Sequence, residues 1–290
     1  MNQDVDVKDA SFMGRSHAWN VFKDALFPLK CLMCGRYYLR PSDSEDPAQK
    51  GPVAETSMAS QTAASLFQRV FSPHICPDCM PLFTPIESPL CTWCGMMFSS
   101  REGGDHVCGA CLEAKHYFSM ARAVGIYHQV LMKVVHALKY EKKVNLAAPL
   151  SLLLLHAFLH FWHDRPVDVV VPVPLFHRRF RSRGFNQVYL AIKYWTRQTY
   201  RNVLPRSLEI DRQVLVRQRS TPPQTGLGRR DRMRNVKDAF ARHAHAAIEG
   251  KRMLLVDDVY TTGATVNECA RVLLHGGAAN VDVLTLARAI

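Results

Sequence analysis

Two adjacent carboxylates and a hydroxyl-rich turn lie together in the last fifth of the sequence. Asp257 and Asp258 follow the apolar run 253–256, and the turn comes directly after them. Two neighbouring carboxylates accept hydrogen bonds, which suits a neighbouring pair of donors such as the 2′ and 3′ hydroxyls of a ribose. The turn offers hydroxyl groups, a glycine that can take positive φ, and backbone N–H groups at a helix start, which together suit a phosphate dianion. Its residues are Thr261, Thr262, Gly263, Ala264 and Thr265.

An Asp-Asp pair before a Thr/Gly turn is by itself an ordinary helix entry. The whole string 253–265 is more specific, because a strand, an acid pair, an anion-binding turn and a helix start follow one another without a gap. This string resembles the motif that binds phosphoribosyl diphosphate (PRPP). We therefore predict PRPP as the ligand of these residues.

Cysteine spacing indicates metal sites. Eight of the nine cysteines form four C-x-x-C pairs, which are Cys31/Cys34, Cys76/Cys79, Cys91/Cys94 and Cys108/Cys111. Two thiolates at this spacing grip one Zn²⁺ together, and two such pairs complete a tetrahedral site of the zinc-ribbon kind. A disulfide framework would need an exported chain, and thioredoxin-like redox pairs would need an adjacent βαβ pattern. The spacing thus predicts two structural zinc ions.

The glycines beside the cysteines favour one pairing of these motifs. Gly35 follows Cys34 and Gly95 follows Cys94, and a glycine there lets the turn fold back on the metal. We expect the first pair to join the second, and the third to join the fourth. An interleaved arrangement, in which the first pair joins the third, stays open.

Positive charge is concentrated in one segment. Residues 171–242 hold 17 Lys and Arg against 4 Asp and Glu, in a chain of net charge +12. Four of these arginines, Arg178, Arg179, Arg181 and Arg183, follow a predicted strand and suit a diphosphate. Residues 217–235 are expected to form a mobile basic loop over the site. Single-stranded DNA is a second partner for this surface, with Phe180, Phe185 and Tyr189 as stacking residues.

Hydrophobic patterning predicts the elements that position these groups. We expect strands at 167–173, 253–256 and 280–286, and helices at 126–139, 146–162, 186–200 and 266–274. Strands that alternate with helices predict an α/β fold with a doubly wound parallel sheet. His156, His160 and His163 have partial metal-ligand spacing but are expected to belong to a helix face.

The 290 residues and the 48% hydrophobic content favour two domains. We expect a double zinc ribbon over residues 20–115, with a disordered Pro- and Ser-rich insertion near 40–65, and a catalytic-type domain over 116–290. The first residues show no signal peptide. Pro149, Ser151 and two histidines interrupt the run 146–162, which we therefore interpret as too short to span a membrane. These features predict a cytoplasmic protein.

Several motifs together resemble the ComF family of competence proteins over nearly all of residues 20–290. Beyond the cysteine pairs and the string 255–265, the motifs are Lys139-Tyr140, Val-Pro-Val-Pro at 171–174, Arg-Gly-Phe-Asn-Gln at 183–187, Arg217 with Gln224, Arg232 with Asn235-Val236, and Ala239-Phe240. The long gap between Cys34 and Cys76 departs from the compact pattern of the family.

The resemblance implies a type I phosphoribosyltransferase domain behind a double zinc ribbon. It further implies that Mg²⁺ accompanies PRPP, that Asp257 and Asp258 hold the ribose, and that Arg183 and Gly184 contact the diphosphate, with Arg183 stabilising its departure. Two functions follow. One is a role in DNA uptake, with single-stranded DNA and competence proteins as partners. The other is an active phosphoribosyltransferase of nucleotide metabolism that acts on a nitrogenous base or an amine. We identify no segment in the sequence that would cover and recognise such an acceptor substrate.

Overall fold

The computed structural model describes residues 28–39, 61–197, 200, 203–221 and 228–290. The amino-terminal part contains β1 (Leu29–Lys30), β2 (Tyr37–Tyr38), α3 (Ala63–Phe71), the 3-10 helix η1 (Met80–Leu82) and α4 (Gly109–Leu112). The central part contains β3 (Ala121–Ile126), α5 (Gln129–Tyr140), η2 (Val144–Leu146), α6 (Ala147–Phe161), β4 (Val169–Pro172), α7 (His177–Arg183), α8 (Gln187–Ile192) and η3 (Lys193–Thr196). The remainder contains β5 (Glu209–Ile210), β6 (Leu215–Arg217), α10 (Arg229–Val236), β7 (Phe240–Arg242), β8 (Arg252–Tyr260), α11 (Ala264–His275) and β9 (Asn280–Arg288).

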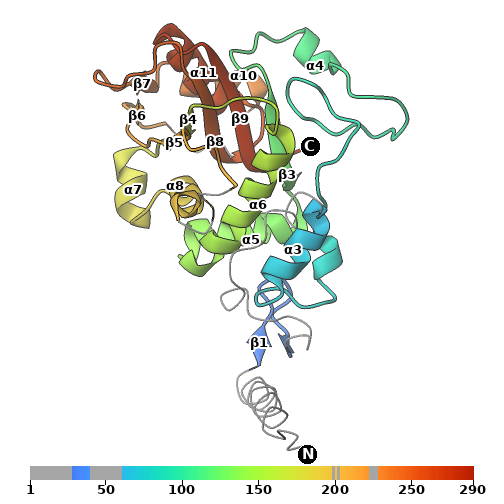
Figure 1. The fold of residues 1–290 in the computed structure, drawn as a ribbon. Coiled ribbons are helices and arrows are strands. Elements are labelled where there is room, and N and C mark those ends of the chain that lie inside the picture. Colours follow the sequence, from blue (N-terminus) through green and yellow to red (C-terminus); the bar gives the residue numbers. More distant parts are fainter. Residues whose placement is uncertain (1–27, 40–60, 198–199, 201–202, 222–227) are drawn as a thin grey trace, which may run out of the picture.

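A five-stranded parallel sheet forms the centre of the fold, in the order β3-β9-β8-β4-β5 (Figure 1). The two longest strands, β8 and β9, pair from Arg252 opposite Asn280 to Tyr260 opposite Arg288. Their long apolar runs match a parallel sheet whose two faces are both covered by helices. The predicted α/β fold with a parallel sheet is therefore confirmed.

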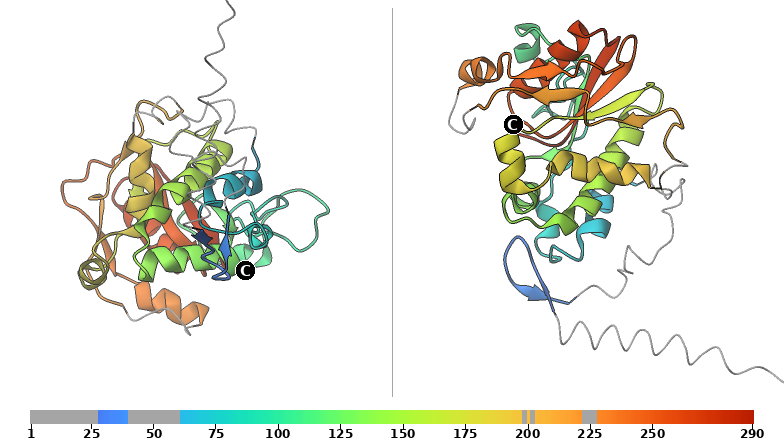
Figure 2. Two further views of the ribbon diagram at one scale, coloured as in Figure 1. Left: turned by 90° about the horizontal axis from the view of Figure 1, so that it is seen from below. Right: turned by 90° about the vertical axis from the view of Figure 1, so that its left-hand side faces the viewer.

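Helices cover the two faces of this sheet (Figures 1 and 2). Side chains alternate between the faces of a strand, so neighbouring residues enter different cores. In β8, Leu254 and Val256 pack in the core beneath α6 and α8, whereas Met253 and Leu255 pack in the core beneath α11. The sheet is thus doubly wound, as expected.

The neighbouring strands β4 and β8 create the point where the winding reverses. The chain leaves β4 through α7 and α8 to reach β5, and it leaves β8 through α11 to reach β9 on the other side. Because α8 and α11 lie on opposite faces of the sheet, the two connections diverge at the carboxyl ends of these strands. Ligands of doubly wound sheets bind in the crevice that such a divergence opens.

The most apolar helix, α6, lies in the interior of the fold. The stretch Val144–Phe161 has 18 residues and a mean hydropathy of 1.6, so by length and composition it could cross a membrane, contrary to the expectation from its polar interruptions. Half of it is buried, and α6 packs against α3, α8, β3 and β9. The core helix of a soluble protein can have the same length and apolar composition. One such helix is therefore weak evidence for a membrane span.

The structure corrects the bounds of several predicted elements. The strand expected at 253–256 continues to Tyr260, so the acid pair lies inside β8. The helix expected from residue 126 begins at Gln129, because Ile126 ends the buried strand β3. That strand was missed because alanine and glycine make up half of its sequence, and both have low β propensity.

Two further segments also differ from expectation. The α-helix expected at 186–200 is capped by Asn186 but ends at Ile192, after which a 3-10 helix runs to Thr196. The loop expected at 217–235 includes the helix α10, Arg229–Val236, while residues 222–227 and with them Gln224 lie outside the described part. A highly charged helix such as α10 lacks the apolar periodicity on which sequence prediction relies.

The amino-terminal part packs on the same core as the sheet. Most of the insertion predicted near 40–65 lies outside the described residues, but its end starts α3, which Thr62 caps through its hydroxyl. One continuous apolar cluster joins Cys31 and Phe67 of this part to Leu254 of β8. Residues on both sides of the predicted border at 115 therefore share one apolar core.

Candidate functional site

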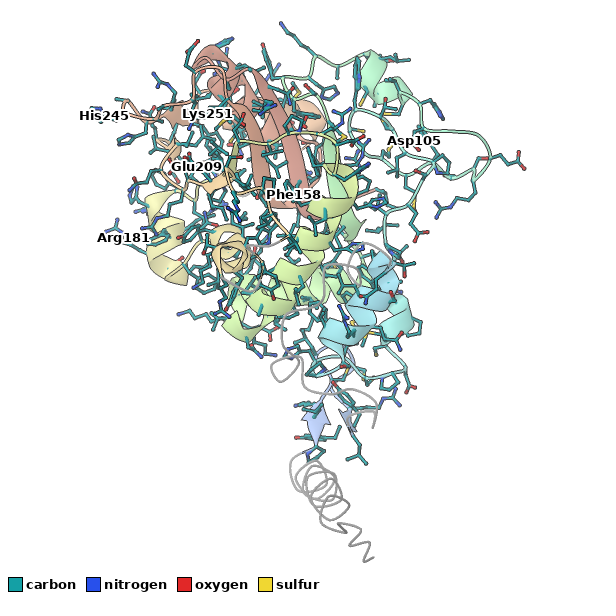
Figure 3. The ribbon with its side chains drawn as sticks, viewed as in Figure 1. Asp105, Phe158, Arg181, Glu209, His245 and Lys251 are labelled. Carbon is teal, nitrogen blue, oxygen red and sulfur yellow. The ribbon has the colours of Figure 1, made fainter. Side chains whose placement is uncertain are left out.

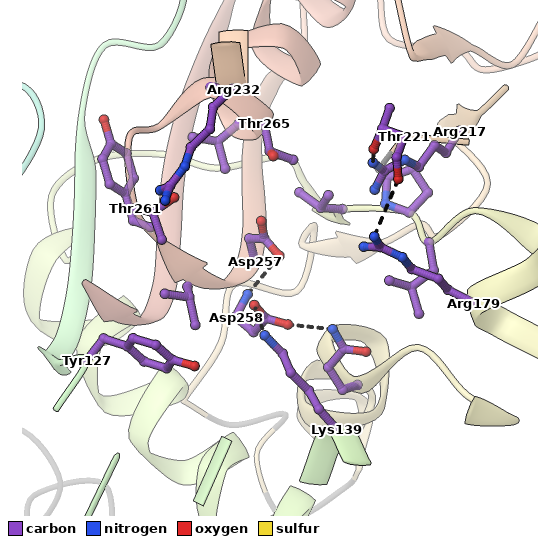
Figure 4. Close-up of a pocket in the computed structure, with 18 of the residues that line it drawn as sticks. Tyr127, Lys139, Arg179, Arg217, Thr221, Arg232, Asp257, Asp258, Thr261 and Thr265 are labelled. Atoms are coloured by element: carbon purple, nitrogen blue, oxygen red, sulfur yellow. Dashed lines mark hydrogen bonds and ion pairs between the residues drawn. The ribbon is translucent and has the colours of Figure 1, made fainter. Parts of the chain in front are cut away.

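A cavity of about 470 Å³ opens at the carboxyl ends of β4 and β8. Its walls come from four places in the sequence, namely the β3–α5 region, the segment after β4, the segment after β6, and the string that ends β8 and starts α11. Figure 4 shows the acid pair at its centre, with arginines above and beside it. The cavity lies where the winding of the sheet reverses.

The acid pair faces this cavity because β8 extends beyond the end of the neighbouring strand β4. The last residue of β4, Pro172, pairs with Val256, whereas Asp257 and Val259 pair only with β9. The side of β8 that faced β4 is therefore open from Asp257 onward. Successive side chains point to opposite faces of a strand, so the two carboxylates meet different surroundings.

Asp258 lies in a closed network of side chains. Its Oδ1 accepts a hydrogen bond of 2.7 Å from Nζ of Lys139 on α5, and its Oδ2 accepts one of 2.5 Å from Nε2 of Gln187 on α8. Burial alone would raise the pKa of Asp258, but Lys139 and Gln187 outweigh it, and the pKa is lowered. Asp258 is ionised and held in place. An ionised carboxylate has further lone pairs, so it can also accept a ligand hydroxyl.

No cation of the described part of the chain donates directly to Asp257. Burial and the neighbouring Asp258 raise the pKa of Asp257 to about 7. One of its oxygens accepts a hydrogen bond of 2.8 Å from the backbone N–H of Asp258. The two adjacent acids therefore differ in charge state near neutral pH, a difference that adjacency in the sequence did not reveal.

The hydroxyl-rich turn forms the opposite wall of the cavity. Gly263 adopts φ +75°, and a side chain there would collide with the ring of Tyr260. Glycine is therefore required on both counts. The cavity is lined by Thr261, Gly263, Ala264 and Thr265, whereas Thr262 is outside the lining and accepts a hydrogen bond of 3.4 Å from the N–H of Ala264. The turn leads into the 12-residue helix α11.

The predicted arginine cluster divides into two groups. Arg179 and Arg183 of α7 line the cavity, but Arg178 and Arg181 do not. Arg181 points outward at the edge of the molecule (Figure 3). Gly184 ends α7 with φ +84° and also lies outside the lining. The helix thus presents cations both to the cavity and to its outer surface.

Two further arginines, Arg217 and Arg232, complete the basic wall. Arg217 ends β6, its Nη2 donates to the hydroxyl of Thr221 at 2.5 Å, and its guanidinium lies 5.1 Å from the ring centre of Phe240. Burial lowers the pKa of Arg217, and its Nε is buried without a hydrogen-bond partner. Among the described residues no carboxylate forms an ion pair with it, and a buried donor of this kind suits an anionic ligand.

The proposed stacking residues do not all lie on the surface. Phe180 is 46% exposed, but Phe185 and Tyr189 pack against the core, and Arg212 lies over the Tyr189 ring at 5.1 Å. Aromatic residues of the α5 region also line the cavity, and of these only Tyr140 belongs to a motif noted in the sequence. These are Tyr127, His136 and Tyr140, from α5 and the residues before it.

The eight paired cysteines form two separate clusters. Each cluster holds four sulfurs within 4.8 Å of one another, and its members are Cys31, Cys34, Cys76 and Cys79, or Cys91, Cys94, Cys108 and Cys111. The expected pairing, first with second and third with fourth, is confirmed. Gly35 and Gly95 both have positive φ, as their turns require.

Sulfur distances in both clusters fit a tetrahedral metal. The Sγ atoms are 3.7 Å apart in Cys34–Cys76 and in Cys91–Cys111, and 3.8 Å apart in Cys94–Cys108. A tetrahedral Zn²⁺ with Zn–S bonds of 2.3 Å gives edges of about 3.8 Å. Disulfides need about 2.0 Å. The clusters therefore suit structural zinc. His156 instead bonds the carbonyl of Gln61, in agreement with a helix face.

The second cluster touches the ligand cavity through one arginine. Arg288 at the end of β9 donates to the carbonyl of Cys94 at 2.6 Å and to its Sγ at 3.2 Å. The same guanidinium lies 4.3 Å from the ring centre of Tyr260, the residue that covers Gly263. Burial raises the pKa of Tyr260 to about 12. A chain of direct contacts thus leads from the cysteines to the turn.

Comparison with known proteins agrees with this geometry. Residues 201–290 match the family described as phosphoribosyl transferase domain. The chain is 34% identical over 220 residues to the DNA utilization protein YhgH of Escherichia coli K12. This alignment covers 74% of the chain and 91% of that protein. Competence protein F of Haemophilus influenzae is 30% identical over 207 residues, covering 69% and 85%. Competence protein ComFC of Bacillus subtilis is 24% identical over 221 residues, covering 74% and 84%.

Proposed function

Because the chain belongs to the ComF family, we propose that its cavity binds PRPP with Mg²⁺ and that the protein takes part in DNA uptake by binding single-stranded DNA. The relatives are named for DNA utilization and competence. The observation that carries the PRPP proposal is the half-buried Arg217 in the cavity wall, whose buried Nε has no hydrogen-bond partner among the described residues. The same cavity holds the acid pair and the hydroxyl-rich turn.

Each wall of the cavity has a role in this proposal. The turn at 261–265 takes the 5′-phosphate of PRPP through its hydroxyls and N–H groups. Asp257 and Asp258 accept the ribose hydroxyls. Arg179, Arg183 and Arg217 contact the diphosphate. Mg²⁺ prefers carboxylate and phosphate oxygens, and Asp257 together with the diphosphate offers both. When bound, the ion neutralises diphosphate charge.

PRPP binding does not by itself imply catalysis. The second candidate function is catalytic transfer of the phosphoribosyl group. In an active phosphoribosyltransferase of nucleotide metabolism, a nitrogen lone pair forms a bond to C1′ of the ribose. The electron pair of the C1′–O bond leaves with diphosphate, and the proton of the nitrogen passes to water. Arg183 would stabilise the charge on the departing diphosphate. The phosphoribosyl transferase domain supports this alternative.

Calorimetric titration with Mg²⁺-PRPP tests the binding proposal, and α7 supplies a matched pair of variants. Arg183→Gln removes a cation that lines the cavity, whereas Arg181→Gln removes one that points outward from the same helix. We expect Arg183→Gln to weaken PRPP binding about tenfold or more, because a charge-assisted hydrogen bond is worth roughly 1.5–3 kcal/mol. Arg181→Gln should bind normally. The proposal is wrong if the wild-type protein shows no PRPP binding, or if both variants bind like it.

A further inference from the structure

Two arginines of the cavity wall belong to elements outside the central sheet (Figure 4). Arg217 ends β6, which in the described part of the chain pairs with β7 alone, and Arg232 lies in α10, which leads into β7. We call residues 228–239, which comprise α10 and its exit, the α10 arm. A diphosphate in the cavity meets both cations only if this arm is held against the rest of the fold.

Apolar packing holds the α10 arm at one end only. Most residues of α10 are charged. Val236 and Ala239 are the buried residues of the arm, among those whose burial the structure describes, and both lie near its exit. Because burial of apolar surface is the main favourable term in packing, the first turns of α10 gain little from it. The position of the arm therefore depends on polar contacts at its exit.

Glu268 on α11 makes the central polar contact. Its Oε1 accepts a hydrogen bond of 2.9 Å from the backbone N–H of Asp238, two residues before β7 begins. Asp238 has φ +55°, a left-handed conformation that aspartate adopts more readily than most residues. The Glu268 side chain is only 11% exposed. The main chain at the turn of the arm is thus bonded to a buried carboxylate of the neighbouring helix.

Arg271 fixes Glu268 in this position. From the next turn of α11, its Nε donates to Oε2 of Glu268 at 2.9 Å and its Nη2 donates to Oε1 at 2.6 Å. The same Nη2 donates to the Asp238 carboxylate at 3.0 Å. Burial alone would raise the pKa of Glu268, but the hydrogen bonds from Arg271 and from the Asp238 N–H outweigh it, and the pKa is lowered. Glu268 is therefore ionised, and its bidentate pair with Arg271 is of the strong kind.

Arg219 holds the exit of α10 from the other side. Its Nη2 donates to the carbonyl of Asn235 at 3.0 Å and to that of Lys237 at 2.7 Å. Carbonyls at the end of a helix have no partner within the helix, so a cation there stabilises it. Arg219 lies two residues after Arg217 in the sequence. The chain that carries one arginine of the cavity therefore also holds the helix that carries the other.

We propose that Glu268 and Arg271 are positioning residues, which tether the α10 arm to α11 and so hold Arg217 and Arg232 where they meet the diphosphate of PRPP. Neither residue of the tether lines the cavity. The inference rests on the proposed function, which supplies the ligand. The helix α11 then serves one ligand twice, because its first turn lines the cavity and its later turns orient the cations for the diphosphate.

The binding test compares Mg²⁺-PRPP with ribose 5-phosphate, which lacks the diphosphate. We expect Glu268→Ala to weaken PRPP binding about tenfold, because the arm loses hydrogen bonds to a charged group. Binding of ribose 5-phosphate should not change, since the turn at 261–265 is intact. Glu268→Gln keeps an oxygen for the Asp238 N–H and should bind PRPP nearly as tightly as the wild type. His275→Ala, which removes an exposed side chain of α11 that contacts Tyr117 instead, serves as control.

Limited proteolysis with trypsin tests the tether without a ligand. Trypsin cleaves after arginine, and α10 offers Arg232 and Arg234. We expect cleavage within α10 to be about tenfold faster in Glu268→Ala, because the cleavage rate follows the population of the locally opened segment. Arg271→Met should act in the same direction, since it leaves Glu268 without its cation. His275→Ala should be cleaved like the wild type.

The outcomes separate the inference from the function on which it rests. If the wild-type protein binds neither ligand, the proposed function fails and the role of the tether falls with it. If the wild type binds PRPP and Glu268→Ala binds it equally well, or if α10 is cleaved no faster in this variant, the tether alone is refuted. Equal losses of both ligands in Glu268→Ala would also refute it, because they would show general damage to the cavity rather than misplaced arginines.

Discussion

At the scale of residues, the two adjacent acids of the cavity are electrostatically unlike. Asp258 forms an ion pair with Lys139. Asp257 is buried beside the negative charge of Asp258, and both effects raise its pKa. The raised pKa of Asp257, about 7 against an ordinary 3.8, means that folding favours its protonated form. This contribution to stability is fully present below pH 4 and is lost as the pH rises through 7.

Asp257→Asn should therefore stabilise the protein at alkaline pH. Asparagine stays neutral, so the free energy of unfolding of this variant should exceed that of the wild type at pH 8. At pH 5 this advantage should be smaller by on the order of 2 kcal/mol. Urea unfolding at the two pH values measures this difference. Equal gains at both pH values would contradict a raised pKa.

Asp168 provides a control of opposite sign. Hydrogen bonds from Arg252 lower the pKa of this carboxyl to about 2. Its contribution is present above pH 4 and is lost as the pH falls through 2. Asp168→Asn should accordingly destabilise the protein at pH 5 and at pH 8 alike, in contrast to Asp257→Asn.

At the scale of elements, hydrophobic patterning predicted individual strands and helices but not the contacts between distant elements. The strand, acid pair, turn and helix of β8 and α11 were predictable, because apolar runs and a Thr/Gly turn are local signals. The contact between α5 and the acid pair was not predictable. Lys139 and Asp258 are 119 positions apart, and no local pattern encodes such a contact.

The cysteine clusters show the same limit. Spacing and glycines predicted the clusters and their pairing, which the structure confirms. The full burial of the second cluster was not predictable, because it depends on how its segments pack on the sheet. Cys91 and Cys94 pack in one core with Leu255 and Cys269, so the second cluster is part of the phosphoribosyl transferase-like fold.

Loss of the second cluster should therefore damage the ligand cavity. We expect Cys91→Ser to lower zinc content from two ions to one per chain, to reduce the melting temperature and to weaken PRPP binding. Cys34→Ser, at an exposed position of the first cluster, should lose one zinc with little effect on PRPP. Metal analysis, thermal unfolding and calorimetry measure these effects. Normal PRPP affinity in zinc-depleted Cys91→Ser would refute the link.

Arg288 is the residue expected to carry that link. Partners that hydrogen-bond to metal ligands typically change metal affinity 10- to 100-fold. Arg288→Met should accordingly speed zinc release to a chromogenic chelator by about tenfold for one of the two ions. Arg252→Met, which removes an arginine paired with Asp168, should leave both release rates unchanged. Unaltered release from Arg288→Met would show that the contact with Cys94 is incidental.

At the scale of the whole molecule, positive charge gathers around the cavity and on the outside of α7. Arg178 and Arg181 lie beyond the cavity, on the helix that also presents Arg179 and Arg183 to it. A single strand of DNA that follows this helix would meet both groups. Its affinity should then depend on salt, with a log–log slope of about −0.7 for each phosphate neutralised.

Fluorescence anisotropy of a labelled oligonucleotide across a salt series tests this surface. Replacing Arg178 and Arg181 by Ala should reduce the slope by about 1.4 and weaken all sequences alike. Lys251→Ala with Arg252→Ala removes the same charge at the opposite end of β8, so it serves as control. Saturating Mg²⁺-PRPP should compete with the oligonucleotide. A slope that neither PRPP nor the α7 variant alters would assign DNA to another surface.

The position of β9 in the sheet has a consequence for how the protein reaches its native state. This strand, the last one described, inserts between β8 and β3, and β3 has no other named strand as a neighbour among the described residues. Until β9 pairs, one edge of β8 and one edge of β3 stay open, and open edges template aggregation. Such late, long-range pairing also slows folding. We expect refolding yields to fall as protein concentration rises, and chaperones that shield strand edges to restore them.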